Sequence, residues 1–332
     1  MSVRRTLAPA LLLAVTLVAA GCGTGSADEP APAAKAATRV FKLPDGEVTI
    51  PADPQRVVAT GYAVPALIEA GAPLAGISSW KRGLPMMDDK ARATYDKLPK
   101  VAGETAAETN YEAIANAKPD LIVIGVPKPV LADIDLDRLR SIAPVVTIGP
   151  TIPSAWRELS QSQADAAGAL EGFDTVKAAY DAKAAELKKK YEKVLPQLKL
   201  AHVGSYGQVD KGAFHREFNG SWGTNIANDI GANYYGQVKV KGGGSKDVSE
   251  YPSIEELPAA LGEADAVTYS VGPDGKPLPA VQYVLDSELW KQLPAVKAGK
   301  VFPVRYTEAA TYGQALLALD ALDQSLAPLA AQ

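Results

Sequence analysis

The fold of the chain is decided by residues 110–125, NYEAIANAKPDLIVIG. Residues 111–117 are predicted to form a helix, and residues 121–124 are an apolar run that predicts a short buried strand. The same order returns at residues 253–270, SIEELPAALGEADAVTYS, where a second helix leads into a second apolar run. We therefore interpret the chain as two halves of related build.

Strands and helices also alternate ahead of each copy. The predicted elements are strands at 57–59 and 74–77 around a helix at 66–70, and strands at 201–204 and 234–236 around a helix at 225–230. Strands that alternate with helices pair in parallel through right-handed crossovers. The sequence thus predicts an α/β fold of two Rossmann-like lobes, residues 38–150 and 196–332, with a ligand cleft between the lobes.

The region between the lobes, residues 151–195, contains a long polar stretch. Within it Phe173, Tyr180 and Leu187 recur at helical spacing, and the pattern ends at Leu195-Pro196. We predict one helix of roughly 23 residues, about 35 Å long at 1.5 Å per residue. Because one such helix braces two lobes without a loose hinge, we expect only a small closure when a ligand binds.

The N-terminus has the three zones of an export signal in residues 1–21: a positive start, an apolar run at 7–20 and small residues before the cysteine. Residues 19–22, AAGC, resemble a bacterial lipobox, in which Cys22 is lipidated and begins the mature protein. Residues 22–37 are expected to form a flexible tether. A leader that is not cleaved, with Cys22 as an ordinary small residue, is the alternative.

Charge and cysteine content exclude several classes of protein. Loss of Arg4 and Arg5 with the leader changes the formal net charge from −4 to −6, which disfavours nucleic-acid binding. Cys22 is the only cysteine, so no internal disulfide can form. We expect a monomer on the outer face of the cell membrane.

Candidate ligand-binding residues follow from the rule that ligands collect beyond the carboxyl ends of parallel strands. Aromatic rings and cations gather in these predicted loops of both lobes, where rings offer packing area and guanidinium groups donate hydrogen bonds. The candidates are Tyr62, Trp80, Arg82, Tyr206, Arg216, Trp222, Arg305 and Tyr306.

Three stretches together resemble the helical-backbone class of solute-binding proteins that serve ABC importers of ferric siderophores, haem and cobalamin. They are residues 66–77 (ALIEAGAPLAGI), 101–125 (VAGETAAETNYEAIANAKPDLIVIG) and 289–304 (LWKQLPAVKAGKVFPV). The resemblance implies that a Glu on each lobe docks on the membrane permease, and by position these are Glu112 and Glu255. The alternative is that both lie in capping boxes and simply complete helix N-termini.

The cargo implied is a ferric siderophore, whose iron is already caged, so the protein needs no metal ligands of its own and no cofactor. Lys81, Arg82, Arg216 and Arg305 offer positive charge, but Glu217 and Glu308 dilute it, so a ferric hydroxamate is favoured over an anionic catecholate. A site for a naked metal ion is not expected, because the chain has only His202 and His215 and the first lies within a predicted strand.

Three alternatives stay open. Haem would find axial-ligand types in Tyr62, Met86, Met87, His215 and Tyr306. Cobalamin is a second cargo of the same fold. An exported hydrolase acting on a chelate is a third possibility, but no nucleophile elbow of the form Gly-x-Ser-x-Gly is present, so we do not expect an enzyme.

Overall fold

The computed structural model describes residues 37–330, which lie within one compact unit. The predicted leader, the lipobox with Cys22 and the tether up to residue 36 lie outside the described residues. No helix within residues 37–330 has the length and apolar character needed to span a bilayer.

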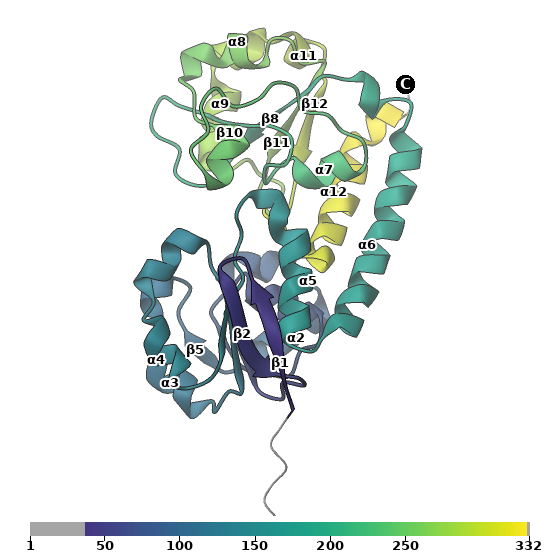
Figure 1. The fold of residues 1–332 in the computed structure, drawn as a ribbon. Coiled ribbons are helices and arrows are strands. Elements are labelled where there is room, and N and C mark those ends of the chain that lie inside the picture. Colours follow the sequence, from purple (N-terminus) through teal and green to yellow (C-terminus); the bar gives the residue numbers. More distant parts are fainter. Residues whose placement is uncertain (1–36, 331–332) are drawn as a thin grey trace, which may run out of the picture. The chain divides into compact units, whose positions relative to one another are not determined.

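The first lobe is built on a five-stranded parallel sheet of order β5-β4-β3-β6-β7 (Figure 1). The strands of this sheet are β3 (Val57–Gly61), β4 (Leu74–Ser78), β5 (Lys100–Ala102), β6 (Leu121–Gly125) and β7 (Val145–Thr147). The helices of the lobe are α1 (Ala63–Glu69), α2 (Asp89–Lys97), α3 (Tyr111–Asn116) and α4 (Leu136–Arg140). A hairpin of β1 (Thr38–Leu43) and β2 (Gly46–Pro51) precedes them in the chain. Every residue of β6 is buried, as expected of a strand covered on both faces. The strands predicted at 57–59, 74–77 and 121–124 are β3, β4 and β6, whereas β5, β7 and the hairpin were not predicted.

The second lobe has a five-stranded sheet of order β10-β9-β8-β11-β12. Its elements are β8 (Leu200–Gly204), β9 (His215–Glu217), α7 (Asn225–Asp229), β10 (Ser249–Glu250), α8 (Leu257–Leu261), β11 (Ala266–Ser270), α9 (Pro279–Asp286), α10 (Glu288–Gln292), α11 (Pro294–Lys297) and β12 (Val301–Val304). β8, β11 and β12 are parallel, but β9 is antiparallel to both of its neighbours.

Two sequence predictions for this lobe were wrong. The expected strand at 234–236 contributes only one bridge, between Tyr234 and Leu200. The place beside β8 is taken by β9, which was expected to be a loop. Both errors arise because short segments of mixed polarity carry too little periodicity to separate strand from loop.

Three long helices connect the lobes: α5 (Trp156–Ala166), α6 (Leu170–Tyr191) and α12 (Tyr312–Ala330). The long helix predicted at 173–195 is α6, which has 22 residues and begins three residues earlier and ends four residues earlier than expected. α6 runs along both lobes, and α12 lies beside it along the second lobe, beginning at the junction (Figure 1). Lys188, Lys189 and Lys190 lie in the last turn of α6, where their positive charges stabilise the negative end of the helix dipole.

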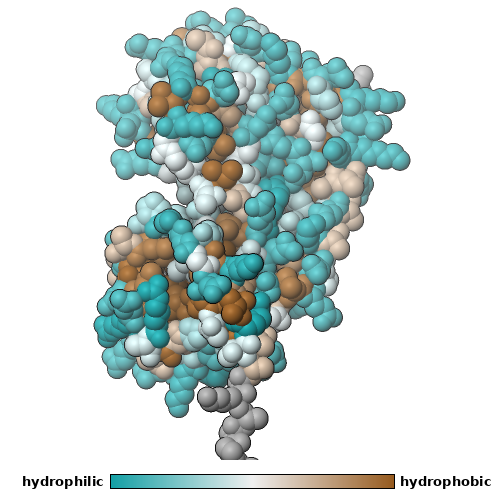
Figure 2. Space-filling model, viewed as in Figure 1, coloured by the Kyte–Doolittle hydropathy of each residue, from teal (hydrophilic) through white to brown (hydrophobic). Residues whose placement is uncertain are grey.

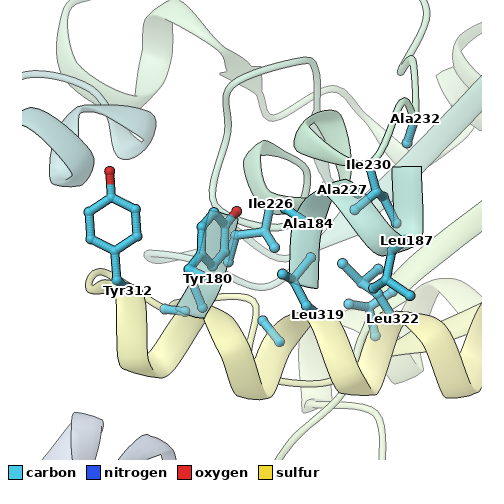
Figure 3. Packing of buried hydrophobic residues seen from close by; sticks show 14 of the residues in the cluster. Tyr180, Ala184, Leu187, Ile226, Ala227, Ile230, Ala232, Tyr312, Leu319 and Leu322 are labelled. Atoms are coloured by element: carbon cyan, nitrogen blue, oxygen red, sulfur yellow. The ribbon is translucent and has the colours of Figure 1, made fainter. Parts of the chain in front are cut away.

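Buried side chains from α6, α7 and α12 interlock where these helices meet (Figure 3). Leu187 of α6 is fully buried and lies beside Leu322 of α12 in this cluster. Truncation of a leucine in such a position generally costs about 2–5 kcal/mol. The tyrosine rings of Tyr180 and Tyr312 meet edge to face, with centroids 5.3 Å apart. The helices that join the lobes therefore share one packed core.

Candidate ligand-binding site

The first lobe supplies two aromatic rings and one cation to the site. Tyr62 follows β3, where Gly61 adopts a left-handed conformation (φ 61°) and a side chain at this position would clash with the carbonyl of Gly125. Trp80 follows β4, and its backbone N–H donates to the hydroxyl of Tyr95 (2.9 Å). The guanidinium of Arg82 lies 4.0 Å from the Trp80 ring centroid and 4.7 Å from that of Tyr62.

The second lobe faces these groups with two further rings. Tyr206 follows β8, and Trp222 lies between β9 and α7. The rings of Trp222 and Tyr62 are stacked across the two lobes, with centroids 6.0 Å apart and planes 10° apart. Tyr206 packs on Trp222 at 5.1 Å. Four of the sequence-predicted rings and one predicted cation therefore come together.

A hollow of about 200 Å³ adjoins this aromatic cluster. Arg82, Met86, Tyr306 and Glu308 line the hollow, and Arg82, Met86 and Glu308 also contact the aromatic cluster. Tyr306 has a left-handed backbone conformation (φ 62°), which is uncommon for a residue with a side chain. In the space-filling view the surface is hollowed between the two lobes (Figure 2).

Burial favours the neutral forms of two ionisable groups of the site, the hydroxyl of Tyr62 and the carboxyl of Glu308. Desolvation raises the pKa of the Tyr62 hydroxyl above its usual value, although the nearby Arg82 opposes this. Desolvation also raises the pKa of Glu308, again against the effect of Arg82. The site therefore offers a neutral phenol, one cation and a carboxyl group that is reluctant to ionise.

The structure does not bring Arg216 to this site. Arg216 lies on β9, its guanidinium is 3.5 Å from the carboxylate of Glu250, and it stacks on Phe218 and Tyr235. Residues 215–217 form β9, between β10 and β8, and not the cleft loop that the sequence predicts.

Arg305 is also placed elsewhere. Its guanidinium donates to the amide oxygen of Gln324 on α12 (3.0 Å), and it lines a separate hollow of about 500 Å³ between β12 and α12. Sequence order correctly placed Arg305 after β12. The left-handed turn at Tyr306 follows directly, and these neighbouring side chains line different hollows.

Neither histidine reaches the aromatic cluster. His202 lies in β8, within a strand as predicted, and its two ring nitrogens contact the hydroxyls of Thr268 (2.7 Å) and Ser270 (3.0 Å). His215 is buried in β9 and stacks on Tyr251. Within residues 37–330, no group of three or more His, Cys, Asp or Glu side chains is arranged to hold a metal ion.

The two glutamates expected at the permease are not helix caps. Asn110 caps α3, since its side chain accepts from the N–H of Ala113 (3.0 Å), and Glu112 is exposed. Ser253 caps the turn ahead of α8 and Glu255 is exposed. The neighbouring Glu256 forms an ion pair with Lys239 (2.7 Å).

Sequence reasoning missed two polar contacts that hold the lobes together. Glu69 of α1 accepts hydrogen bonds from the Thr311 hydroxyl (2.6 Å) and the Gly313 N–H (3.0 Å) at the start of α12. Asn225 of α7 accepts from the indole N–H of Trp156 in α5 (3.0 Å). An acidic residue at a helix C-terminus, where it opposes the dipole, was the one available signal for Glu69.

Comparison with known proteins agrees with this architecture. A model of the periplasmic binding protein family matches residues 57–305. The chain belongs to this family. It is a substrate-binding protein with two α/β lobes, as the resemblance implied.

The relatives of this chain are named as iron(3+)-hydroxamate-binding or siderophore-binding proteins. The chain is 29% identical over 300 residues to the iron(3+)-hydroxamate-binding protein YxeB of Bacillus subtilis. This match covers 88% of this chain and 86% of the relative. It is 26% identical over 303 residues to the iron(3+)-hydroxamate-binding protein FhuD of the same organism, covering 88% and 87%. A solved siderophore periplasmic binding protein from the fuscachelin gene cluster of Thermobifida fusca is 28% identical, with a TM-score of 0.67, and the match covers 84% of this chain and 98% of that one.

Proposed function

We propose that the protein captures a ferric siderophore of the hydroxamate type outside the cytoplasm and delivers it to the permease of an ABC importer. The proposal rests on one observation: rings from both lobes, Tyr62 and Trp80 with Tyr206 and Trp222, meet in one cluster. The guanidinium of Arg82 lies over the Tyr62 and Trp80 rings at its edge. A ferric siderophore presents a bulky, partly apolar shell, which flat rings can cover and a guanidinium can orient.

Charge favours hydroxamates over catecholates. Arg82 is the one Lys or Arg among the residues that line the aromatic cluster and its adjoining hollow, and Glu308 lies beside it. A ferric tricatecholate is strongly anionic and needs several cations, whereas a ferric trihydroxamate is neutral or mildly cationic. The placement of Arg216 and Arg305 away from the site therefore supports the hydroxamate.

A polar atom in the aromatic cluster is available for the cargo. The indole N–H of Trp222 is buried and has no hydrogen-bond partner within residues 37–330. A buried donor without a partner carries an energetic cost that an acceptor on a ligand would remove. A hydroxamate oxygen is such an acceptor.

The hollow is smaller than the roughly 300–1,000 Å³ of typical ligand pockets. We therefore propose that the contact between Tyr62 and Trp222 opens when the chelate enters. Rotation of these side chains, with small adjustments between the braced lobes, would provide the space.

A titration of intrinsic fluorescence tests the cargo. A linear ferric trihydroxamate, a ferric tricatecholate, hemin and cyanocobalamin are added separately to wild-type protein and to Trp222→Phe. Saturable quenching by the trihydroxamate, weakened by Trp222→Phe, is expected. Trp290→Phe is the matched control, because Trp290 is buried in the core of the second lobe. Tight binding of the tricatecholate alone would contradict the choice of cargo.

Haem is the second candidate, because Tyr62 and Met86 line the same cluster and both are axial-ligand types. The raised pKa of Tyr62 disfavours the phenolate that a haem iron would bind. A sharpened Soret band on addition of hemin would favour this cargo, and tight binding of cyanocobalamin would favour the third.

We propose that the protein is a carrier and not an enzyme. The ferric chelate recovered after incubation should be chemically unchanged by mass spectrometry. A cleaved chelate would revive the hydrolase alternative.

We propose further that a lipid on Cys22 anchors the protein to the membrane as a monomer, and that Glu112 and Glu255 dock on the permease. Both glutamates are exposed, one on each lobe. Replacing both with Ala should abolish uptake of the iron chelate by cells and leave the affinity of the purified protein unchanged. Normal uptake by the double variant would refute the docking role.

A Cys22→Ser variant should be released from the membrane fraction.

A further inference from the structure

The loop that carries Trp222 has to turn back to reach the site. We call residues 218–224 the Trp222 loop. β9 runs antiparallel to β8, so Glu217 at its end pairs with His202 in the middle of β8 and not with the cleft end. The carboxylate of Glu217 accepts from the N–H of Gly223 (2.5 Å), which folds the loop back over the sheet. Trp222 thereby lies beside Tyr206.

The side chain of Asn225, the first residue of α7, holds this loop from the other side. Its amide nitrogen donates to the carbonyl oxygens of Ser221 (2.7 Å) and Trp222 (3.2 Å). Its amide oxygen accepts from the indole N–H of Trp156 (3.0 Å) and the guanidinium of Arg157 (3.0 Å). The first two partners can only accept and the last two can only donate, so the orientation of the amide is fixed by its neighbours. Asn225 is 2% exposed.

The anchor behind Asn225 belongs to α5, which packs against α1 of the first lobe. Arg157 of α5 also forms an ion pair with Asp229 of α7 (2.5 Å), and the hydroxyl of Tyr180 in α6 donates to the same carboxylate. A buried polar group with every donor and acceptor paired specifies one geometry, because any other arrangement leaves a buried group without a partner. Asn225 therefore connects the Trp222 loop to a fixed part of the molecule outside the second lobe.

We propose that Asn225 is a positioning residue for ligand recognition: its amide holds the carbonyls of Ser221 and Trp222 so that the Trp222 ring faces the cleft. The effect expected on ligand affinity rests on the proposed function. Its consequence for the Trp222 ring can be measured without any ligand.

The test uses Asn225→Asp in the mature chain. Asp keeps the oxygen that accepts from Trp156 and Arg157, and it replaces the donor to the loop by a second acceptor that repels the carbonyls. Asn228→Asp is the matched control on the same helix. It keeps the acceptor for the N–H of Gly220 and loses donations to Ala232 and to Asn219, near the start of the Trp222 loop. The contacts of Asn225 with Ser221 and Trp222 stay in place.

Two readouts are compared. The first is the ¹⁹F NMR spectrum of protein labelled with 5-fluorotryptophan, in which Trp222→Phe assigns the Trp222 line. The second is the affinity for a linear ferric trihydroxamate, measured by calorimetry. We expect Asn225→Asp to shift or broaden the Trp222 line and to weaken binding by about tenfold or more, and Asn228→Asp to have a clearly smaller effect on both.

The outcomes separate the inference from the proposed function. An unchanged Trp222 line in Asn225→Asp overturns the inference. So does an equal loss of affinity in both variants in proportion to their melting temperatures, because that indicates general destabilisation. If the wild-type protein binds no ferric siderophore, the proposed function fails while the fluorine spectra still decide whether Asn225 positions the ring.

Discussion

Replacement of Glu69 by Ala should destabilise the protein by removing the polar contact between α1 and the start of α12. The Glu69 carboxylate accepts hydrogen bonds from the Thr311 hydroxyl (2.6 Å) and the Gly313 N–H (3.0 Å). It also places a negative charge at the positive end of a 19-residue helix. The substitution leaves both donors without this acceptor.

The magnitude follows from these contacts. Two hydrogen bonds contribute about 1 kcal/mol each, and a carboxylate at a helix N-terminus adds roughly 0.3–1 kcal/mol. Burial opposes part of this, since desolvation raises the pKa of Glu69 to about 7. We expect a loss of about 2 kcal/mol in the free energy of unfolding, or roughly 3 °C in melting temperature for a chain of this size.

Urea unfolding followed by circular dichroism measures the change. Glu69→Gln keeps an oxygen for Gly313 and a nitrogen that can donate to the Thr311 hydroxyl, so it should lose less than about 1 kcal/mol. Glu112→Ala removes an exposed carboxylate and serves as the control. If Glu69→Ala is no less stable than Glu112→Ala, or if Gln costs as much as Ala, the contact does not stabilise the junction and the reasoning is refuted.

Four further predictions concern charge and motion. Arg82→Gln should weaken binding of a ferric trihydroxamate by about tenfold, whereas Arg305→Gln, whose guanidinium contacts Gln324 away from the site, should leave the affinity unchanged in the same calorimetric titration. Burial lowers the pKa of His202 and His215 to about 3, so their contribution to stability is present above pH 6.5 and is lost as the pH falls towards 3. The free energy of unfolding, measured against pH, should show this loss, and the loss should be smaller in His202→Gln. Burial raises the pKa of Glu217 to about 7, so its contribution is present below about pH 4.5 and is lost as the pH rises through 7; Glu217→Gln should flatten that limb of the curve. Small-angle scattering should show little change in radius of gyration on ligand binding, and a large decrease would contradict the bracing role of the long helices.

The two lobes were predictable because their signal is local. Apolar runs such as residues 121–124 can be recognised without any knowledge of distant partners, and α6 shows its buried face at helical spacing. The aromatic site was also largely predictable. Tyr62, Trp80 and Tyr206 follow parallel strands, whose carboxyl ends share one edge of the sheet.

The choice among cations was not predictable in the same way. Arg82 and Arg216 have equivalent sequence signals, each lying near an aromatic residue in a polar segment. Residues 215–217 pair as an antiparallel strand, and this pairing depends on β8 and β10 rather than on the segment itself. Strand pairing of so short a segment is decided by its neighbours.

The sequence by itself determined the central strands of each lobe, the duplication of the lobes and the long helix between them, because periodicity and turn residues act over a few positions. Only the tertiary structure decided which side chains meet. Glu69 and Thr311 are 242 residues apart in the chain, and Trp156 and Asn225 are 69 apart. Such contacts form because the packed helices bring distant polar groups together in a place where water cannot satisfy them, and no local pattern records that requirement.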